Sequence, residues 1–129
     1  MRVFVDTSAW LDFIKVGARS DVGHVLSDLL QKGDLIHSLP IIVQEVLQGF
    51  KSEELAEEYA DLFEGLTQLP FGPDEAREAA ALYRSLRRKG ITVQTTDAQI
   101  AATCIRHKLK LLTLDKDFRR IEGIEFAAF

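Results

Sequence analysis

Val3-Phe4-Val5-Asp6-Thr7-Ser8-Ala9-Trp10-Leu11-Asp12 is the stretch that decides the fold. Its first apolar residues, two of them β-branched, predict a buried strand over residues 2–5. Asp6, Thr7 and Ser8 are residues that begin helices, and the apolar residues after them predict a short helix over residues 9–14. The chain therefore opens with a buried strand that leads directly into a helix.

The same alternation continues to the other end of the chain. Apolar runs predict further strands over residues 35–37, 111–114 and 124–126, while helical spacing of apolar residues fills the segments between them. Because strands that alternate with helices form parallel sheets covered on both faces, we predict an α/β fold, an α/β/α sandwich with a short central parallel sheet. The intervening helices are expected over residues 22–30, 40–47, 53–63, 73–90 and 97–105. Their start and stop signals are a glycine, two prolines, a serine and an aspartate: Gly33 after the first, Pro40 and Pro73 at the start of the second and fourth, Ser52 before the third and Asp97 at the last. On the fourth helix the residues expected to face inward are Ala76, Ala80, Tyr83 and Leu86.

Length and composition narrow the class of protein. The chain has 129 residues, 47% hydrophobic and 28% charged, which fits one domain over residues 1–129. No apolar run is long enough to span a membrane or to serve as a signal peptide, so no membrane association is expected. Cys104 is the single cysteine and there are three histidines, which leaves too few ligands for a Cys/His zinc cage and favours a reducing, cytoplasmic location.

Charge is distributed unevenly along the chain. Residues 1–83 hold 6 Lys or Arg against 15 Asp or Glu, and residues 84–129 hold 10 against 5, so the balances are −9 and +5. An acidic protein usually repels polyanions, but a basic C-terminal third offers a local surface for one. In that third, Arg84, Arg87 and Arg88 share one helical face, and Lys116 and Arg119 flank two acids. We predict that these five residues bind a polyanion; a solvated basic surface is the alternative.

Carboxylates stand where the predicted strands end and at helix starts. Asp6 follows the first strand, and Asp115 and Asp117 follow the strand over residues 111–114. Glu45 shares a helical face with apolar residues, and Asp97 begins a helix. In a parallel sheet Asp6 and Asp115 emerge at the same edge, where open α/β sheets bind ligands.

Each acid also has a purely structural interpretation. Asp6 and Asp97 could cap the helices that follow them, although Thr7 or Ser8 could replace Asp6 as a cap. Either Asp115 or Asp117 could form a turn or cap the next helix, and Glu45 could lie at the edge of its apolar stripe and reach water. Clustered together, however, these acids cannot all stay ionised without cations, and oxygen ligands favour Mg²⁺ or Mn²⁺. Nearby hydroxyls could hydrogen bond to the acids or to a substrate phosphate: Thr7, Ser8, Thr96 and Thr113.

Four stretches, in order, resemble the motif blocks of a known family. Residues 3–12 resemble the opening of a PIN domain, residues 40–49 its glutamate helix, and residues 96–103 and 111–118 its third and fourth blocks. Their order, their spacing and the total length are similar to those of the VapC toxins of bacterial and archaeal toxin–antitoxin pairs.

The resemblance implies an endoribonuclease that requires Mg²⁺ or Mn²⁺. Its catalytic acids would be Asp6, Glu45, Asp97 and Asp115, with Asp117 as an auxiliary acid. Asp6, Asp97, Asp115 and Asp117 would supply the metal ligands, and whether Asp115 or Asp117 lies closer to the metal stays open. The resemblance also implies an RNA substrate, homodimers and neutralisation by a VapB-type antitoxin. The alternative is a PIN-like module that has lost catalysis and only binds RNA or a protein.

Other enzymes with acids at strand ends fit the sequence less well. A haloacid-dehalogenase-type phosphatase needs an Asp where Ser8 stands, and receiver domains need paired acids after the first strand. There is no glycine-rich phosphate loop, which disfavours nucleotide hydrolysis. His24 and His107 are expected on solvated helix faces, so they do not form a histidine-based ribonuclease site.

Overall fold

A five-stranded parallel sheet forms the centre of the molecule, with strand order β3-β2-β1-β4-β5. The computed structural model describes residues 1–33 and 35–129. The strands are short, two or three residues each: β1 (Val3–Val5), β2 (Ile36–Ser38), β3 (Thr67–Gln68), β4 (Lys110–Leu112) and β5 (Glu125–Phe126).

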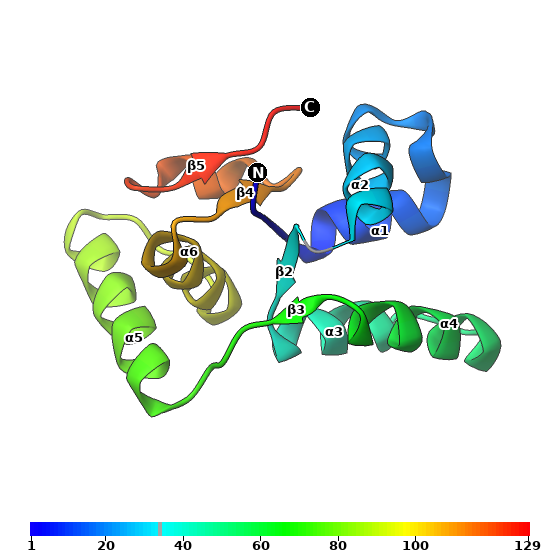
Figure 1. Cartoon of the computed structure of the whole chain (residues 1–129). Helices are drawn as coiled ribbons and strands as arrows, with labels where there is room; N and C mark the ends of the chain where they lie inside the picture. The colour runs from blue at the N-terminus through cyan, green and yellow to red at the C-terminus, as the bar shows by residue number, and fades with distance from the viewer. Residues whose placement is uncertain (34) are drawn as a thin grey trace.

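Helices cover both faces of this sheet (Figure 1). The helices α1 to α4 lie on one side, and α5 and α6 lie on the other, which confirms the predicted α/β/α sandwich. Their bounds are α1 (Thr7–Val16), α2 (Asp21–Lys32), α3 (Pro40–Leu47), α4 (Glu53–Glu64), α5 (Pro73–Arg88) and α6 (Thr95–His107). Two 3₁₀ helices complete the fold, η1 (Gly17–Arg19) and η2 (Lys116–Arg120).

The winding of the chain reverses between β1 and β4. The connections from β1 through β2 to β3 move toward one edge of the sheet, and the chain then crosses back to β4 on the opposite side of β1. Right-handed crossovers in opposite directions place their helices on opposite faces. The carboxyl ends of β1 and β4 therefore form a topological switch point, where a crevice opens and ligands bind in folds of this kind.

The core is continuous from the sheet into the helices. Val3, Phe4 and Val5 are fully buried, as expected for a strand covered on both faces. Trp10 is also fully buried, and its ring meets Phe63 of α4 edge-on with the ring centroids 4.9 Å apart. Trp10 is therefore a core residue that joins α1 to α4.

The structure corrects several of the sequence-based expectations. The strand β3 was not expected, because its two exposed residues carry no apolar pattern. Asp97 was expected to cap its helix, but α6 begins two residues earlier, at Thr95. On α5 the predicted inward residue Leu86 is buried and Tyr83 is half-buried, but Ala76 and Ala80 are exposed and Ala79 is buried instead.

In the part of the chain that the structure describes, no helix has the length and apolar character needed to cross a bilayer.

A carboxylate cluster at the switch point

Asp6 lies where β1 ends and α1 begins. Its backbone N–H donates to Leu112 O in β4 at 3.2 Å, so the first acid is tied to the neighbouring strand at the switch point. The residue is 4% exposed and its side chain accepts from the N–H of Ala9, which makes Asp6 itself the cap of α1. Of the two predicted interpretations, helix cap and site acid, the first is confirmed and the second is compatible with the position.

Two hydroxyl groups hold the Asp6 carboxylate. Ser8 Oγ donates to Oδ1 at 2.6 Å, and Thr113 Oγ1 donates to Oδ2 at 2.7 Å. The same hydroxyls accept the backbone N–H groups of the loop after β4: Leu114 N donates to Ser8 Oγ at 3.0 Å and Asp115 N to Thr113 Oγ1 at 2.9 Å. Burial raises the pKa of Asp6, and these hydrogen bonds offset part of the increase. The carboxylate therefore has a fixed orientation.

A second carboxylate reaches this edge from α3. Thr7 Oγ1 donates to Glu45 Oε1 at 2.8 Å, which links the start of α1 to the middle of α3. Glu45 is half-buried and its second oxygen has no protein hydrogen-bond donor among the described residues. Pro40 starts this helix at its first position, as predicted, and so sets where Glu45 emerges.

Asp97 enters from the opposite face of the sheet, on the first turn of α6. The helix cap is Gln94, so the carboxylate of Asp97 has no capping role. Its pKa is raised from 3.8 to about 6. Burial is the largest cause, and four neighbouring carboxylates add to it in decreasing order: Asp115, Asp6, Asp117 and Glu45. The other four predicted acids therefore all act on Asp97 at this edge.

Asp115 and Asp117 complete the cluster from η2. Asp115 caps η2 by accepting the N–H of Asp117 at 2.9 Å, as a turn-forming Asp would. Asp117 is exposed, and its Oδ1 lies 3.9 Å from the guanidinium of Arg120. A hollow of about 300 Å³, here called the acidic pocket, is lined by Thr92, Val93, Gln94, Asp97, Asp115, Asp117 and Arg120.

Part of this pocket could not be predicted from the sequence. Arg120 also donates to Thr92 O at 3.3 Å, so it connects η2 to the loop before α6. Its position three residues after Asp117 was a signal for an ion pair, but nothing in the pattern indicated the loop of Thr92 to Gln94. Thr96 was predicted beside the acids, and it is half-buried with no side-chain hydrogen bond among the described residues.

The donor set fits a hard divalent cation in its chemistry. Five carboxylates gather with only Arg120 as a close cationic partner in the described chain, and after burial these carboxylates contribute to the raised pKa of Asp97. Within residues 1–33 and 35–129, however, no three His, Cys, Asp or Glu side chains are grouped as a metal-holding set. The protein atoms thus present the ligands, and side-chain rotation would have to bring them to one ion.

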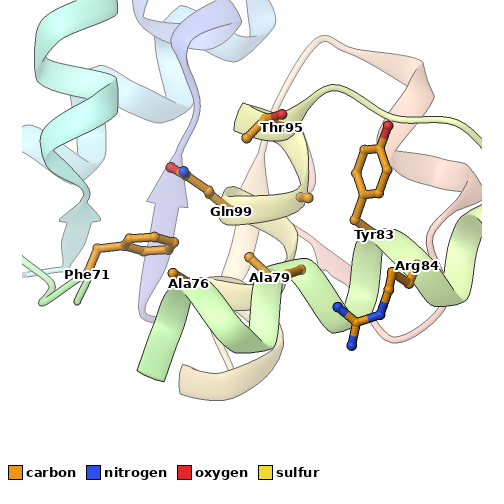
Figure 2. A pocket seen from close by; sticks show the side chains of 9 residues that line it. Phe71, Ala76, Ala79, Tyr83, Arg84, Thr95 and Gln99 are labelled. Atoms are coloured by element: carbon orange, nitrogen blue, oxygen red, sulfur yellow. The ribbon is translucent and has the colours of Figure 1, made fainter. Parts of the chain in front are cut away.

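The predicted RNA-binding residues fall into two separate places. Lys116 and Arg119 are exposed on η2, next to Asp115. Arg84, Arg87 and Arg88 are exposed on the last turns of α5, where Arg87 lies 5.8 Å from the centre of the Tyr83 ring. Figure 2 shows Arg84 and Tyr83 beside a hollow of about 350 Å³ between α5 and the start of α6. The structure does not bring these arginines to the acidic pocket.

The chain is similar in sequence and in fold to proteins of one known family. The PIN domain family model matches residues 3–124. The chain is 31% identical to ribonuclease VapC11 of Mycobacterium tuberculosis over 98% of each chain, and 39% identical to ribonuclease VapC1 of Rickettsia felis over 67% of this chain and 70% of the relative. The toxin–antitoxin complex VapBC of Salmonella typhimurium, solved bound to DNA, contains a chain with a TM-score of 0.80, 23% identity and coverage of 98% and 97%.

Proposed function

The chain belongs to the PIN-domain family and, within it, to the VapC ribonucleases, and from this premise we propose that it is an endoribonuclease that depends on Mg²⁺ or Mn²⁺. The observation that carries the proposal is the gathering of five carboxylates at the switch point of the sheet, where Asp97 and Asp115 line one hollow and Asp6 is tied to β4. The pKa of Asp97 is raised by burial first and by the other four carboxylates next, which agrees with that arrangement. We further propose that residues 1–129 act as a single domain and that it works in the cytoplasm, as a toxin.

Each of these side chains would have a separate role in the reaction. Asp6, Asp97 and Asp115 would hold the cation, with Asp117 as the outer acid, because Asp117 is exposed and faces Arg120. Glu45 would accept a proton from the attacking water through the oxygen that Thr7 leaves free. Ser8 and Thr113 would keep the Asp6 carboxylate in one orientation. When bound, a divalent cation would neutralise charge on the phosphodiester and acidify the attacking water.

Cleavage of RNA with and without chelator tests this proposal. We expect total RNA to be cut only with Mg²⁺ or Mn²⁺, leaving 5′-phosphate and 3′-hydroxyl ends because water is the nucleophile. Asp97→Asn should abolish cleavage. Asp61→Asn, the same change on the exposed face of α4, should cleave as the wild type does.

Two results would contradict the proposal. Cleavage that persists in excess chelator, or products with 2′,3′-cyclic phosphate, would exclude the metal mechanism. Tight RNA binding without any cleavage would favour the alternative, a catalytically inactive binding module.

We also propose a VapB-type antitoxin partner. The relatives of known structure include VapBC complexes, and this chain exposes large apolar side chains on α1 and α4. Leu11 on α1 is 46% exposed and Leu55 on α4 is 44% exposed. The helix α4 also borders a hollow that it shares with α3, lined by Pro40, Val43, Ala60, Phe63, Glu64 and Gln68.

Co-expression with the protein encoded next to this chain tests the partner. We expect the two to purify together, and Leu55→Glu to weaken the complex without changing the melting temperature. Free expression at high level without slowed growth, and with no bound neighbour, would contradict the toxin role while leaving the nuclease activity possible. The homodimer expected from the resemblance belongs to the same proposal, and light scattering measures it.

A further inference from the structure

A second hollow lies on the other side of Asp115 from the acidic pocket. It has a volume of about 190 Å³ and is here called the tail hollow. Asp115 lines both hollows, and Thr113, which also holds Asp6, lines the tail hollow. A ligand in the tail hollow would therefore touch the wall of the acidic pocket. The lining residues are Thr113, Leu114, Asp115, Lys116, Arg119 and Phe129.

The tail hollow exposes two large apolar side chains. Leu114 is 43% exposed and Phe129 is 49% exposed. Leu114 is also anchored, because its backbone N–H donates to Ser8 Oγ at 3.0 Å. An exposed aromatic ring beside an anchored aliphatic side chain forms a flat apolar surface at the rim of the site.

The cations of η2 are divided between the two hollows. Arg120 turns toward Asp117 and the acidic pocket, whereas Lys116 and Arg119 line the tail hollow. The guanidinium of Arg119 lies 5.0 Å from the centre of the Phe126 ring, which holds it over β5. Throughout residues 1–33 and 35–129, Lys116 and Arg119 form no ion pair within 4 Å. Two uncompensated positive charges therefore border the apolar surface.

We propose that the tail hollow binds one nucleotide of the RNA strand next to the cleaved phosphodiester. Its base would stack on Phe129 and contact Leu114, and its phosphate would bind Lys116 and Arg119. This inference rests on the proposed nuclease function and adds a positioning subsite to it. Because every base has an aromatic face, such a subsite tolerates sequence and sets where the strand lies.

Charge and shape favour a nucleotide over a protein segment. A nucleotide presents a flat apolar ring and an anion in one unit, which matches an apolar surface bordered by two cations. An acidic peptide could also pair with the cations, but an Asp or Glu side chain carries no ring that could stack on Phe129. An acidic segment of the antitoxin is therefore the competing occupant that the experiment must separate.

Fluorescence anisotropy in chelator measures binding without cleavage. The probes are a labelled single-stranded oligoadenylate decamer and a decamer of the same length and charge that lacks bases. We expect the wild type to bind the oligoadenylate more tightly than the base-free strand. Phe129→Ala should weaken binding of the oligoadenylate about tenfold and leave binding of the base-free strand unchanged. Phe129→Tyr, which keeps the ring, should restore the wild-type affinity.

Two further variants complete the test. Replacing Lys116 and Arg119 by Gln should weaken both probes alike and lower the slope of log affinity against log salt by about 0.7 for each phosphate that is no longer neutralised. Ile105→Ala removes another exposed apolar side chain, on the far part of α6, and should change neither affinity.

The outcomes also separate this inference from the nuclease function. Equal affinity of Phe129→Ala and wild type for the oligoadenylate would overturn the subsite, even where the enzyme still cleaves RNA. Unchanged RNA binding by Phe129→Ala together with weakened antitoxin binding would assign the tail hollow to the antitoxin instead. Failure of the nuclease function is seen separately, as absence of metal-dependent cleavage by the wild type.

Discussion

Asp6 shows how one residue can be both a structural cap and a site acid. Its Oδ1 accepts the N–H of Ala9 and the hydroxyl of Ser8, and among the described residues the one side-chain hydroxyl that donates to its Oδ2 is that of Thr113. A carboxylate oxygen has two acceptor positions, so Oδ2 retains one for another ligand. Capping and chemistry therefore use different lone pairs, and the two interpretations of this residue do not compete.

That division predicts the behaviour of Asp6→Asn. Asn caps helices about as well as Asp, and the Thr113 hydroxyl can reverse its role to accept from the new amide. We expect the free energy of unfolding to change by less than about 1 kcal/mol while RNA cleavage is abolished. Urea denaturation and a cleavage assay on the same preparation measure both. A folded Asp6→Asn protein that cleaves at the wild-type rate would remove Asp6 from the site.

Asp97 carries a pH dependence of stability. Its pKa is about 6 in the folded chain against an ordinary value of 3.8, so the folded state binds this proton more tightly. The contribution of this proton to the free energy of unfolding is fully present below about pH 3.8 and is lost as the pH rises through about 6. In metal-free buffer, Asp97→Asn should therefore raise stability at pH 7.5 by about 1–2 kcal/mol, after solvent screening at the open pocket is allowed for.

The gain in stability of Asp97→Asn should vanish at low pH, and urea denaturation at pH 4 and pH 7.5 measures this difference. Asp74→Asn is the matched control, because Asp74 stands in the first turn of α5 but is exposed and outside the cluster. Loss of the favourable interaction with the helix dipole should make that control slightly less stable, by roughly 0.5 kcal/mol. A pH-independent gain in Asp97→Asn would contradict the coupling among the carboxylates.

At the level of elements, Gly23 fixes how α2 returns beside α1. A Cβ atom at Gly23 would lie 2.0 Å from the backbone oxygen of Gly17, and no side-chain rotation can relieve such a contact. Gly23→Ala should therefore destabilise the chain by about 1–3 kcal/mol, although Ala ordinarily favours a helix over Gly by about 1 kcal/mol. Gly65→Ala, whose Cβ would meet only Leu62 O at 3.4 Å, is the control and should change stability little; thermal denaturation compares the two.

Sequence patterns predicted the elements that have their own start signals. Ser52 caps α4, Pro40 and Pro73 open α3 and α5, and Gly33 ends α2, all as expected. These signals are local, because a cap or a proline acts on the backbone within one turn. Asp6 and Asp115 could be predicted for the same reason, because each follows directly on the apolar run of its strand.

Features that depend on tertiary packing could not be predicted from such local signals. The buried face of α5 is set by α6, whose Arg106 contacts Glu75 at 3.5 Å and Glu78 at 2.6 Å. This docking turns Ala79 inward and leaves Ala76 and Ala80 exposed. The sequence suggests a cap at Asp97 because this residue follows two threonines, yet these threonines themselves become helical. The correction strengthens the candidate site, because a carboxylate that caps nothing needs another reason to be half-buried.

At the scale of the whole molecule, the basic residues of the C-terminal third form two separate patches on the surface. One borders the acidic pocket at η2, and the other is the end of α5, beside the hollow of Figure 2. The two places lie on opposite sides of the first turn of α6. A strand of RNA that reaches both must cross that turn, whereas a short strand needs only η2.

The arginines of α5 provide the test of that longer path. Replacing Arg84, Arg87 and Arg88 by Gln should weaken the binding of long single-stranded RNA whatever its sequence, because phosphate contacts carry no base information. The slope of log affinity against log salt should fall by about 0.7 for each phosphate that these side chains no longer bind, and cleavage at saturating RNA should be nearly unchanged. The same change of charge at Lys15, Lys32 and Lys51, in the acidic part of the chain, is the control and should leave the slope as it is.

Were the triple arginine variant to keep the wild-type slope, RNA would not cross α5, and its arginines would serve solubility or pair with an acidic partner. Only the cations of η2 would then guide the strand toward Asp97 and Asp115.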